Sequence, residues 1–317
     1  RGNTEFRIGK QIHSWGMVDE NSPVDVVNGH DYYYLFNSGA ERKLGSWSLS
    51  TETYLSDFVI KTIFSPFHQT NRLPVIDGDP DPEFGFNFPI VPNSRQFMNV
   101  ENPVEGGMTI SQSFSHVDLQ YSFFTGYDRI FNLSGINVFA KVPNANDPSS
   151  VYIDLVFGYR KTFVHGIGFT YFLGGLTMRS DFGYFSTSDQ NESVNRSNPV
   201  FDITAEGDTI VLHPYPYFGD SGTEFPIEFR ESAEYTQLNI QLEYDLPWDI
   251  QFFGQYFENN ILEYQAGELG INDPICMTNL CIDPEEFKPE NIFTPGMGAP
   301  TGALSDQSIM LNLEKSF

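Results

Sequence analysis

Hydrophobic and polar side chains alternate along much of this chain. In residues 235–246, the even-numbered positions are mostly Leu, Ile or Tyr, whereas the odd-numbered positions are mostly Gln, Asn, Glu or Asp. A period of two over such a length is typical of a β-strand, because successive side chains of a strand point to opposite faces. The pattern predicts further strands at 6–13, 44–55, 58–67, 107–115, 117–126, 161–172, 176–186, 250–258 and 308–317, with 151–158 as an additional candidate.

The connections between these strands alternate between short and long. Tight turns are expected at Ser56-Asp57, Ser115-His116, Leu173-Gly174-Gly175 and Pro247-Trp248-Asp249. The long connections are rich in Pro, Gly, Asn and Asp and cover 15–43, 68–105, 128–150, 188–232 and 265–304. Loops above about 15 residues are uncommon in compact soluble domains. Short turns that alternate with long loops are typical of a transmembrane β-barrel, whose tilted strands need about ten residues each.

We therefore predict an all-β fold, a transmembrane antiparallel up-and-down β-barrel of about ten or more strands in one domain over 1–317. Long loops would lie outside and short turns in the periplasm. Bulky polar side chains are hard to bury in a dry core but suit a wet lumen. The predicted pore-lining residues are Arg7, Gln11, Lys61, Asp118, Arg179, Asp181, Asn239, Gln241 and Glu243. A soluble lectin-like sandwich is the alternative outside a membrane.

The chain is strongly acidic. Its 42 Asp and Glu against 17 Lys and Arg give a formal charge of −25, which argues against a nucleic-acid binder because phosphate contacts need a basic surface. Hydrophobic residues at 40% are too frequent for a disordered acidic tail. If the lumen shares the acidic character, the passage would prefer cations.

Four acidic residues, Asp77, Asp79, Asp81 and Glu83, stand at alternate positions in one long connection. Oxygen ligands at alternate positions resemble the start of a calcium loop, so Ca²⁺ is a weak candidate there and no other cofactor is expected. The competing interpretation is an acidic, solvated loop, since Pro82 stands where a calcium loop needs glycine. External carboxylates such as these would also share divalent ions with lipopolysaccharide.

Cys276 and Cys281 lie close together in a Pro-rich stretch and favour a small disulfide loop, with two free thiols as the alternative. Tyr32-Tyr33-Tyr34 sits in the middle of a long connection, where we expect it to pack a loop folded into the barrel mouth rather than an interfacial girdle. Gly219-Asp220-Ser221-Gly222 matches a serine-protease stretch, but its surroundings favour a turn. We therefore expect no catalytic residues and no enzyme.

Four stretches share a pattern with a known family: FRIGKQIHSWG at 6–16, SPVDVVN at 22–28, ERKLGSW at 41–47 and SPFHQTNRLP at 65–74. They resemble an uncharacterised bacterial outer-membrane family, domain of unknown function 1302, which is distantly similar to alginate-export-type porins. The hairpins 161–186 and 233–258 are similar to later parts of it. This chain has Ser22 where the family has Asn. Members usually continue with further strands, so the chain is either a compact relative or a portion of a larger barrel. Phe317 on an alternating strand is also similar to the C-terminal signal of outer-membrane proteins.

The resemblance implies a porin-like channel in the Gram-negative outer membrane for passive transport of small molecules, including apolar ones. The expected partners are outer-membrane lipid, lipopolysaccharide and a small-molecule permeant. Two alternatives come from other classes. One is a structural or docking barrel that sheaths a partner protein in an envelope complex, which would show a plugged lumen. The other is a barrel hydrolase, which would need a His with Ser or Asp at matching heights.

Overall fold

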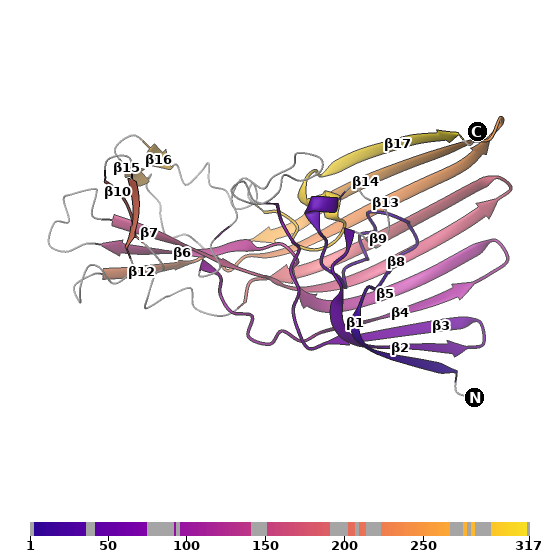
Figure 1. Ribbon diagram of the computed structural model, residues 1–317, viewed down its shortest axis with the longest axis horizontal. Coiled ribbons are helices and arrows are strands. Elements are labelled where there is room, and N and C mark those ends of the chain that lie inside the picture. The colour runs from indigo at the N-terminus through magenta and orange to yellow at the C-terminus, as the bar shows by residue number, and fades with distance from the viewer. Residues whose placement is uncertain are drawn as a thin grey trace.

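Ten antiparallel strands form one continuous sheet in the computed structural model (Figure 1). The structure describes residues 3–35, 42–74, 92, 96–140, 151–190, 202–206, 209–213, 223–266, 275–277, 280–282 and 293–315. The sheet order follows the chain, and its strands are β1 (Thr4–Gln11), β2 (Ser46–Leu55), β3 (Phe58–Ser65), β4 (Glu105–Ser113), β5 (Val117–Tyr127), β8 (Lys161–Leu173), β9 (Leu176–Ser188), β13 (Ser232–Leu246), β14 (Ile250–Gln265) and β17 (Gln307–Lys315).

The tight turns all lie at one end of the sheet, which we call the turn end (Figure 1). They join β2 to β3, β4 to β5, β8 to β9, and β13 to β14. Ser56, Gly174, Trp248 and Asp249 have positive φ angles there. Positive φ is what short hairpin loops require to match the twist of the flanking strands.

Smaller sheets extend from the opposite end (Figure 1). One has the order β12 (Thr223–Glu228), β6 (Asn132–Ala140), β7 (Val151–Gly158), and the others pair β10 (Asp202–Glu206) with β11 (Thr209–His213) and β15 (Ile275–Met277) with β16 (Leu280–Ile282). Two short 3₁₀ helices, η1 (Tyr32–Tyr34) and η7 (Pro300–Ala303), complete the elements. No helix in the described ranges is long and apolar enough to span a membrane.

The strand predictions are confirmed for all ten strands of the main sheet and for 151–158, which is β7. The prediction of 128–150, 188–232 and 265–304 as loops was wrong in part, because β6, β10, β11, β12, β15 and β16 fall within them. In β6 the pairing register shifts between Leu133 and Gly135. Because of this irregularity, Leu133 and Ile136 are three positions apart in sequence and do not follow a period of two, so the alternation does not reveal the strand.

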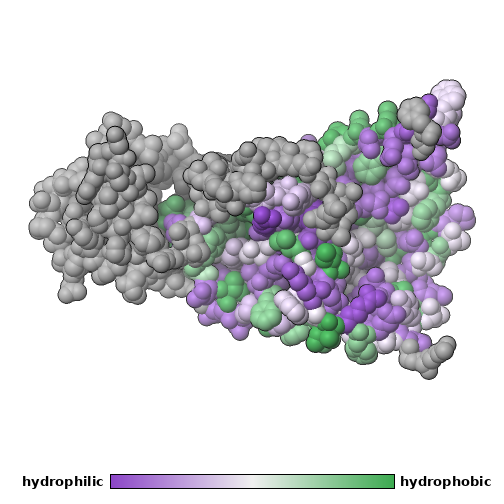
Figure 2. Space-filling view, viewed as in Figure 1, coloured by the Kyte–Doolittle hydropathy of each residue, from purple (hydrophilic) through white to green (hydrophobic). Residues whose placement is uncertain are grey.

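One face of the main sheet is apolar and exposed, and we call it the outer face. Ile8 is 85% exposed, Ile167 59% and Leu311 71%. The strand registers place these residues on the same side as Phe6, Trp47, Leu49, Phe64, Tyr121, Phe182, Leu242, Ile309 and Leu313. Figure 2 shows hydrophobic side chains along the margin formed by β17.

The opposite face, the inner face, is mostly buried and holds polar as well as apolar side chains. Its buried polar members are Ser48, Thr109, Ser122, Thr162, Asp181, Gln237, Asn239, Gln241 and Gln255. Its buried apolar members include Phe124, Val164, Phe185 and Tyr235. A sheet in a water-soluble protein buries its apolar face and exposes its polar one, whereas this sheet exposes an apolar outer face. Within the described residues no ladder joins β1 to β17, and these strands are the edges of the sheet.

Candidate functional site

An irregular stretch of chain, residues 12–35, packs against the inner face, and we call it the inner segment. It follows β1 directly and crosses β8 and β9 in Figure 1. Residues 21–33 are buried without interruption. Tyr32 and Tyr33 are among them, and Tyr32 packs with Leu35 and Ile130. That the tyrosine run packs a loop folded into a barrel mouth stays a prediction. Tyr34 remains exposed.

The main sheet forms a wall behind the inner segment, and glycines of this wall leave room for the segment. A Cβ atom at Gly166 of β8 would lie 2.3 Å from Cγ1 of Val24. A Cβ at Gly168 would lie 3.0 Å from Cγ of Met17 and 2.3 Å from Oδ1 of Asp181. Glycine within a strand often marks such a close approach of another backbone. The wall therefore lacks side chains where the segment needs the space.

Asp181 of β9 is the main polar contact between wall and segment. Its carboxylate accepts hydrogen bonds from the backbone N–H of Met17 at 2.9 Å and of Val18 at 3.0 Å, and from Oγ of Ser22 at 2.7 Å. Asp181 itself is fully buried. The carboxylate thus satisfies backbone donors that would otherwise be unpaired in the interior.

Amide side chains of β13 and β14 continue this contact. Asn239 donates to the carbonyl oxygen of Asn21 at 2.9 Å, and Gln255 donates to that of Glu20 at 2.7 Å. Gln241 accepts from the backbone N–H of Asp19 at 3.0 Å and donates to its Oδ2 at 2.6 Å. Side chains of neighbouring strands therefore supply the hydrogen-bond partners that the backbone of residues 19–21 would otherwise have found in regular secondary structure.

A group of charges lies beside this contact, toward the turn end. Arg179 lies 3.4 Å from Oδ1 of Asp19 and 3.2 Å from Oε1 of Glu243. Gln241 also donates to Oε1 of Glu243 at 2.6 Å. The side chains of Arg179 and Glu243 are 27% and 21% exposed, so this group borders solvent.

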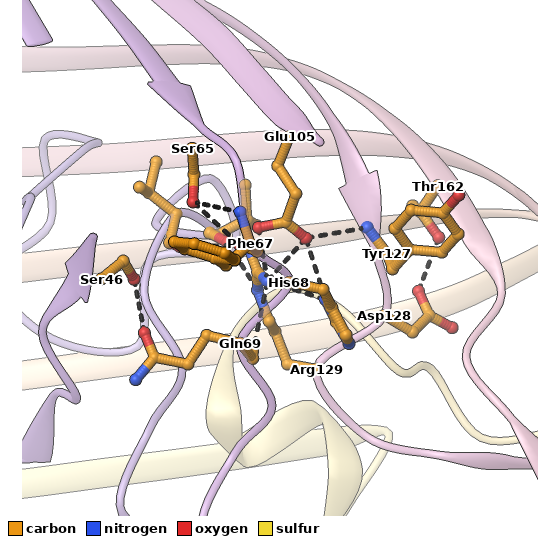
Figure 3. Close-up of polar contacts among 12 residues, drawn as sticks. Ser46, Ser65, Phe67, His68, Gln69, Glu105, Tyr127, Asp128, Arg129 and Thr162 are labelled. Carbon is orange, nitrogen blue, oxygen red and sulfur yellow. Dashed lines mark hydrogen bonds and ion pairs between the residues drawn. The ribbon is translucent and has the colours of Figure 1, made fainter. Parts of the chain in front are cut away.

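A buried arginine holds the next part of the inner segment (Figure 3). Arg129 donates to the carbonyl oxygens of Val26 at 2.9 Å and Val27 at 3.0 Å, and to both oxygens of Glu105 at 2.8 and 2.9 Å. His68 contacts Glu105 at 3.0 Å. Burial lowers the pKa of His68, so at neutral pH the charges here are those of Arg129 and Glu105. The guanidinium fork therefore joins the segment to the start of β4.

Apolar packing fixes the same part of the segment. Trp15, Val26 and Val27 belong to a buried cluster in which the rings of Phe185 and Tyr235 stack 4.6 Å apart. The other members are Ile63, Phe124, Val164, Ala233, Phe293 and Met297. The hydroxyl of Tyr235 donates to the carbonyl oxygen of Met297 at 2.9 Å. Residues 293–303 thus help to close this part of the inner face.

A second buried arginine lies where the strands end opposite the turns. Arg160 contacts Asp128 at 3.0 Å and Glu231 at 3.5 Å, and Asp189 accepts from the backbone N–H of Glu231 at 2.9 Å. Burial raises the pKa of Asp189 to about 6 and also raises the pKa values of Asp128 and Glu231. One guanidinium thus pairs with two carboxyl groups, and the third, that of Asp189, is hydrogen-bonded to the backbone of Glu231.

The predicted lining residues fall into two groups and one outlier. Arg179, Asp181, Asn239, Gln241 and Glu243 come together, but their contacts are with residues 17–22, with Gln255 or with each other. Arg7, Gln11 and Lys61 border a hollow between β1, β2 and β3 that is open to solvent. Asp118 of β5 is separate from both groups. All nine lie on the inner-face side, and their role as lining residues stays a prediction.

Several predicted sites lie in parts of the chain that the structure does not describe, or depend on side chains there. Asp77, Asp79, Asp81 and Glu83 lie outside the described residues, as does Gly219–Gly222. In the described ranges no group of three His, Cys, Asp or Glu is arranged to hold a metal. The backbone register pairs Cys276 with Cys281 across β15 and β16, and the disulfide stays a prediction.

The alternation of the sequence did not point to Glu105, Arg129 or the inner segment. Arg129 follows β5 in a connection without periodicity, so its burial has no local signature. The two glycines in His165-Gly166-Ile167-Gly168, at alternate positions of one strand, were the available signal, because they mark a strand face that another backbone approaches.

Arg129→Met should destabilise the fold by roughly 3–5 kcal/mol, because it leaves the buried Glu105 carboxylate uncompensated. The matched control is Arg179→Met, whose ion pairs border solvent and should change the free energy of unfolding by about 1 kcal/mol or less. Denaturant titration measures both. Equal losses in the two variants would contradict the anchoring role of Arg129.

His30 gives a pH dependence that can be isolated. Burial lowers its pKa to about 3, so the folded state keeps it neutral while the unfolded state binds a proton below about pH 6.5. Stability from this group is therefore lost as pH falls. Between about pH 7.5 and pH 4, wild type should lose roughly 3 kcal/mol more than His30→Gln in denaturant titrations. Parallel pH profiles for the two proteins would refute the buried neutral state.

No family model matches the chain, and no curated protein matches it. The resemblance to the outer-membrane family stays a prediction.

Proposed function

We propose that this chain is an outer-membrane β-barrel of a Gram-negative bacterium that acts as a narrow passive channel for small solutes. The observation that carries the proposal is the exposed apolar outer face of the sheet, which lies opposite an inner face with many buried polar side chains. Exposing Phe6, Ile8 and Leu311 to water is unfavourable by roughly 2 kcal/mol each, whereas acyl chains would cover them at no such cost. The outer face is the surface that lipid would contact.

Closure of the sheet into a barrel is part of the proposal. Hydrocarbon has no partners for backbone N–H and C=O groups, so an edge strand there must pair. β1 and β17 run in opposite directions, since the main sheet has ten strands in consecutive antiparallel order. Their pairing would give an antiparallel ladder like every other one in the sheet. Tight turns at one end and long connections at the other match the organisation of bacterial barrels.

Preference for cations follows from the charges on the turn-end half of the inner face. The acidic residues there are Glu5, Glu52, Asp118, Glu243, Asp245 and Glu314, with Asp19 of the inner segment beside them, and the basic ones are Arg7, Lys61 and Arg179. Carboxylates outnumber basic groups, and a ring of excess acidic charge attracts cations.

A structural or docking barrel is the second candidate, and the inner segment is the observation that favours it. Residues 21–33 are buried and fill part of the inner face, as a plugged lumen would require. Such a barrel would insert into membranes without passing ions.

The test is to refold the chain from denaturant into lipid vesicles and record currents in planar bilayers under a salt gradient. We expect ion currents whose reversal potential shows cation preference. Glu52→Gln should shift that potential toward zero, because it removes an inner-face charge. The matched control Glu258→Gln removes the same charge from the outer face and should not shift it.

Other outcomes separate the alternatives. Insertion without current would favour the structural barrel, and anion preference would contradict the electrostatic argument. A chain that stays monomeric in buffer without detergent would overturn the membrane proposal.

A further inference from the structure

The inner segment is held in two different ways along its length. Residues 16–22 are attached to the wall through hydrogen bonds from polar side chains, chiefly those of Asp181, Asn239, Gln241 and Gln255. Residues 24–28 are instead held by apolar packing and by Arg129. The two parts meet at Pro23.

The first part, residues 16–22, has attachments that water can replace. Met17 and Val18 lie outside the buried apolar cluster, and the side chain of Asp19 is 53% exposed. A hydrogen bond to water replaces a hydrogen bond to protein with a small net change in free energy, whereas separating packed apolar surface does not. Detachment of this part is therefore far less costly than detachment of residues 24–28.

The second part, residues 24–28, is fixed from several sides. Val24, Val26 and Val27 are 2–3% exposed. Asn28 donates to the carbonyl oxygens of Gln11 and Leu44, which ties the segment to β1 and to the start of β2. Residues 24–28 thus fix the C-terminal end of residues 16–22.

The backbone at both ends of the first part has the conformations of a turn. Gly16 has φ of +96°, and a Cβ there would lie 2.5 Å from Oδ2 of Asp181. Asn21 has φ of 55°, in the left-handed region that Asn tolerates better than most residues. Both positions permit φ changes that a bulky residue would resist.

We propose that residues 16–22 are a movable constriction of the passage, held against the wall by Asp181, and that cationic small solutes pass when it detaches. This inference rests on the proposed channel function and names the segment that limits it. The constriction reaches the walls of β9, β13 and β14 through Asp181, Gln241 and Gln255, so it stands across part of the inner face. Its charged border, Asp19, Arg179 and Glu243, has an excess of negative charge that favours a cationic solute. Asp181 acts as a positioning residue.

Asp181→Asn tests the attachment. All three of its partner groups are donors, so an amide nitrogen in place of one oxygen would face another donor. Loss of one charge-assisted hydrogen bond shifts an equilibrium on the order of tenfold, so the open fraction in single-channel records should rise by about that factor. The control Glu258→Gln removes one negative charge from the outer face, away from the segment, and should leave the open fraction unchanged. Equal behaviour of the two variants would overturn the proposal.

A reversible lock keeps the test independent of folding defects. Oγ of Ser22 lies 2.7 Å from Oδ2 of Asp181, so the thiols of Ser22→Cys with Asp181→Cys lie near enough for a short bis-methanethiosulfonate crosslinker, which a reductant removes. The crosslinked protein should conduct less than wild type, and reduction of the same sample should raise its current above wild type. Identical currents before and after reduction would refute the movable constriction.

Hydrogen exchange separates this inference from the channel itself. The amides of residues 17–19 should exchange faster than those of residues 30–32, which bond to fixed backbone and to Asn71. Fast exchange at 17–19 in a vesicle-inserted protein that passes no ions would show a mobile segment and overturn the channel. Slow exchange at 17–19 in a conducting protein would overturn the constriction and leave the channel intact.

Discussion

The arrangement depends on one requirement, that buried backbone groups find hydrogen-bond partners. The inner segment passes through the interior with little regular secondary structure, so few of its N–H and C=O groups pair with one another. Polar side chains of the wall meet that need, with Asp181 accepting from N–H groups and Asn239 and Gln255 donating to C=O groups. Arg129 does the same for Val26 and Val27. Removing these side chains would leave the interior with unpaired polar atoms, each costing about 1–3 kcal/mol.

This requirement also explains why the inner face carries so many polar side chains. Where a strand uses its inward positions for hydrogen bonds with the buried segment, the apolar positions that alternate with them face outward. They form a continuous surface from Phe6 on β1 to Leu313 on β17. Such a surface suits hydrocarbon and is a liability in water, where large exposed apolar patches drive association. The same alternation therefore provides side chains that bind the inner segment on one face and side chains that suit hydrocarbon on the other.

The strands and their faces could be predicted from the sequence because a period of two is a local property. Asp181, Asn239 and Gln241 were assigned to the polar face from this period alone. What they contact could not be predicted, since no local pattern shows which long connection folds inward. β6 was missed for a related reason, because its irregular register at Leu133–Gly135 hides the alternation. Arg129 and Glu105 are 24 positions apart in sequence, and their pairing follows from strand order.

The native tryptophans offer the most direct test of the outward-facing apolar surface. Trp47 of β2 is 59% exposed on the outer face, and Trp15 is buried behind the wall at 4%. Two single-tryptophan proteins in vesicles, one keeping Trp47 and the other Trp15, would be quenched with lipids brominated on their acyl chains. The account predicts strong quenching of Trp47 and little quenching of Trp15. Trp47 that is insensitive to brominated lipid but quenched by a water-soluble quencher would contradict it.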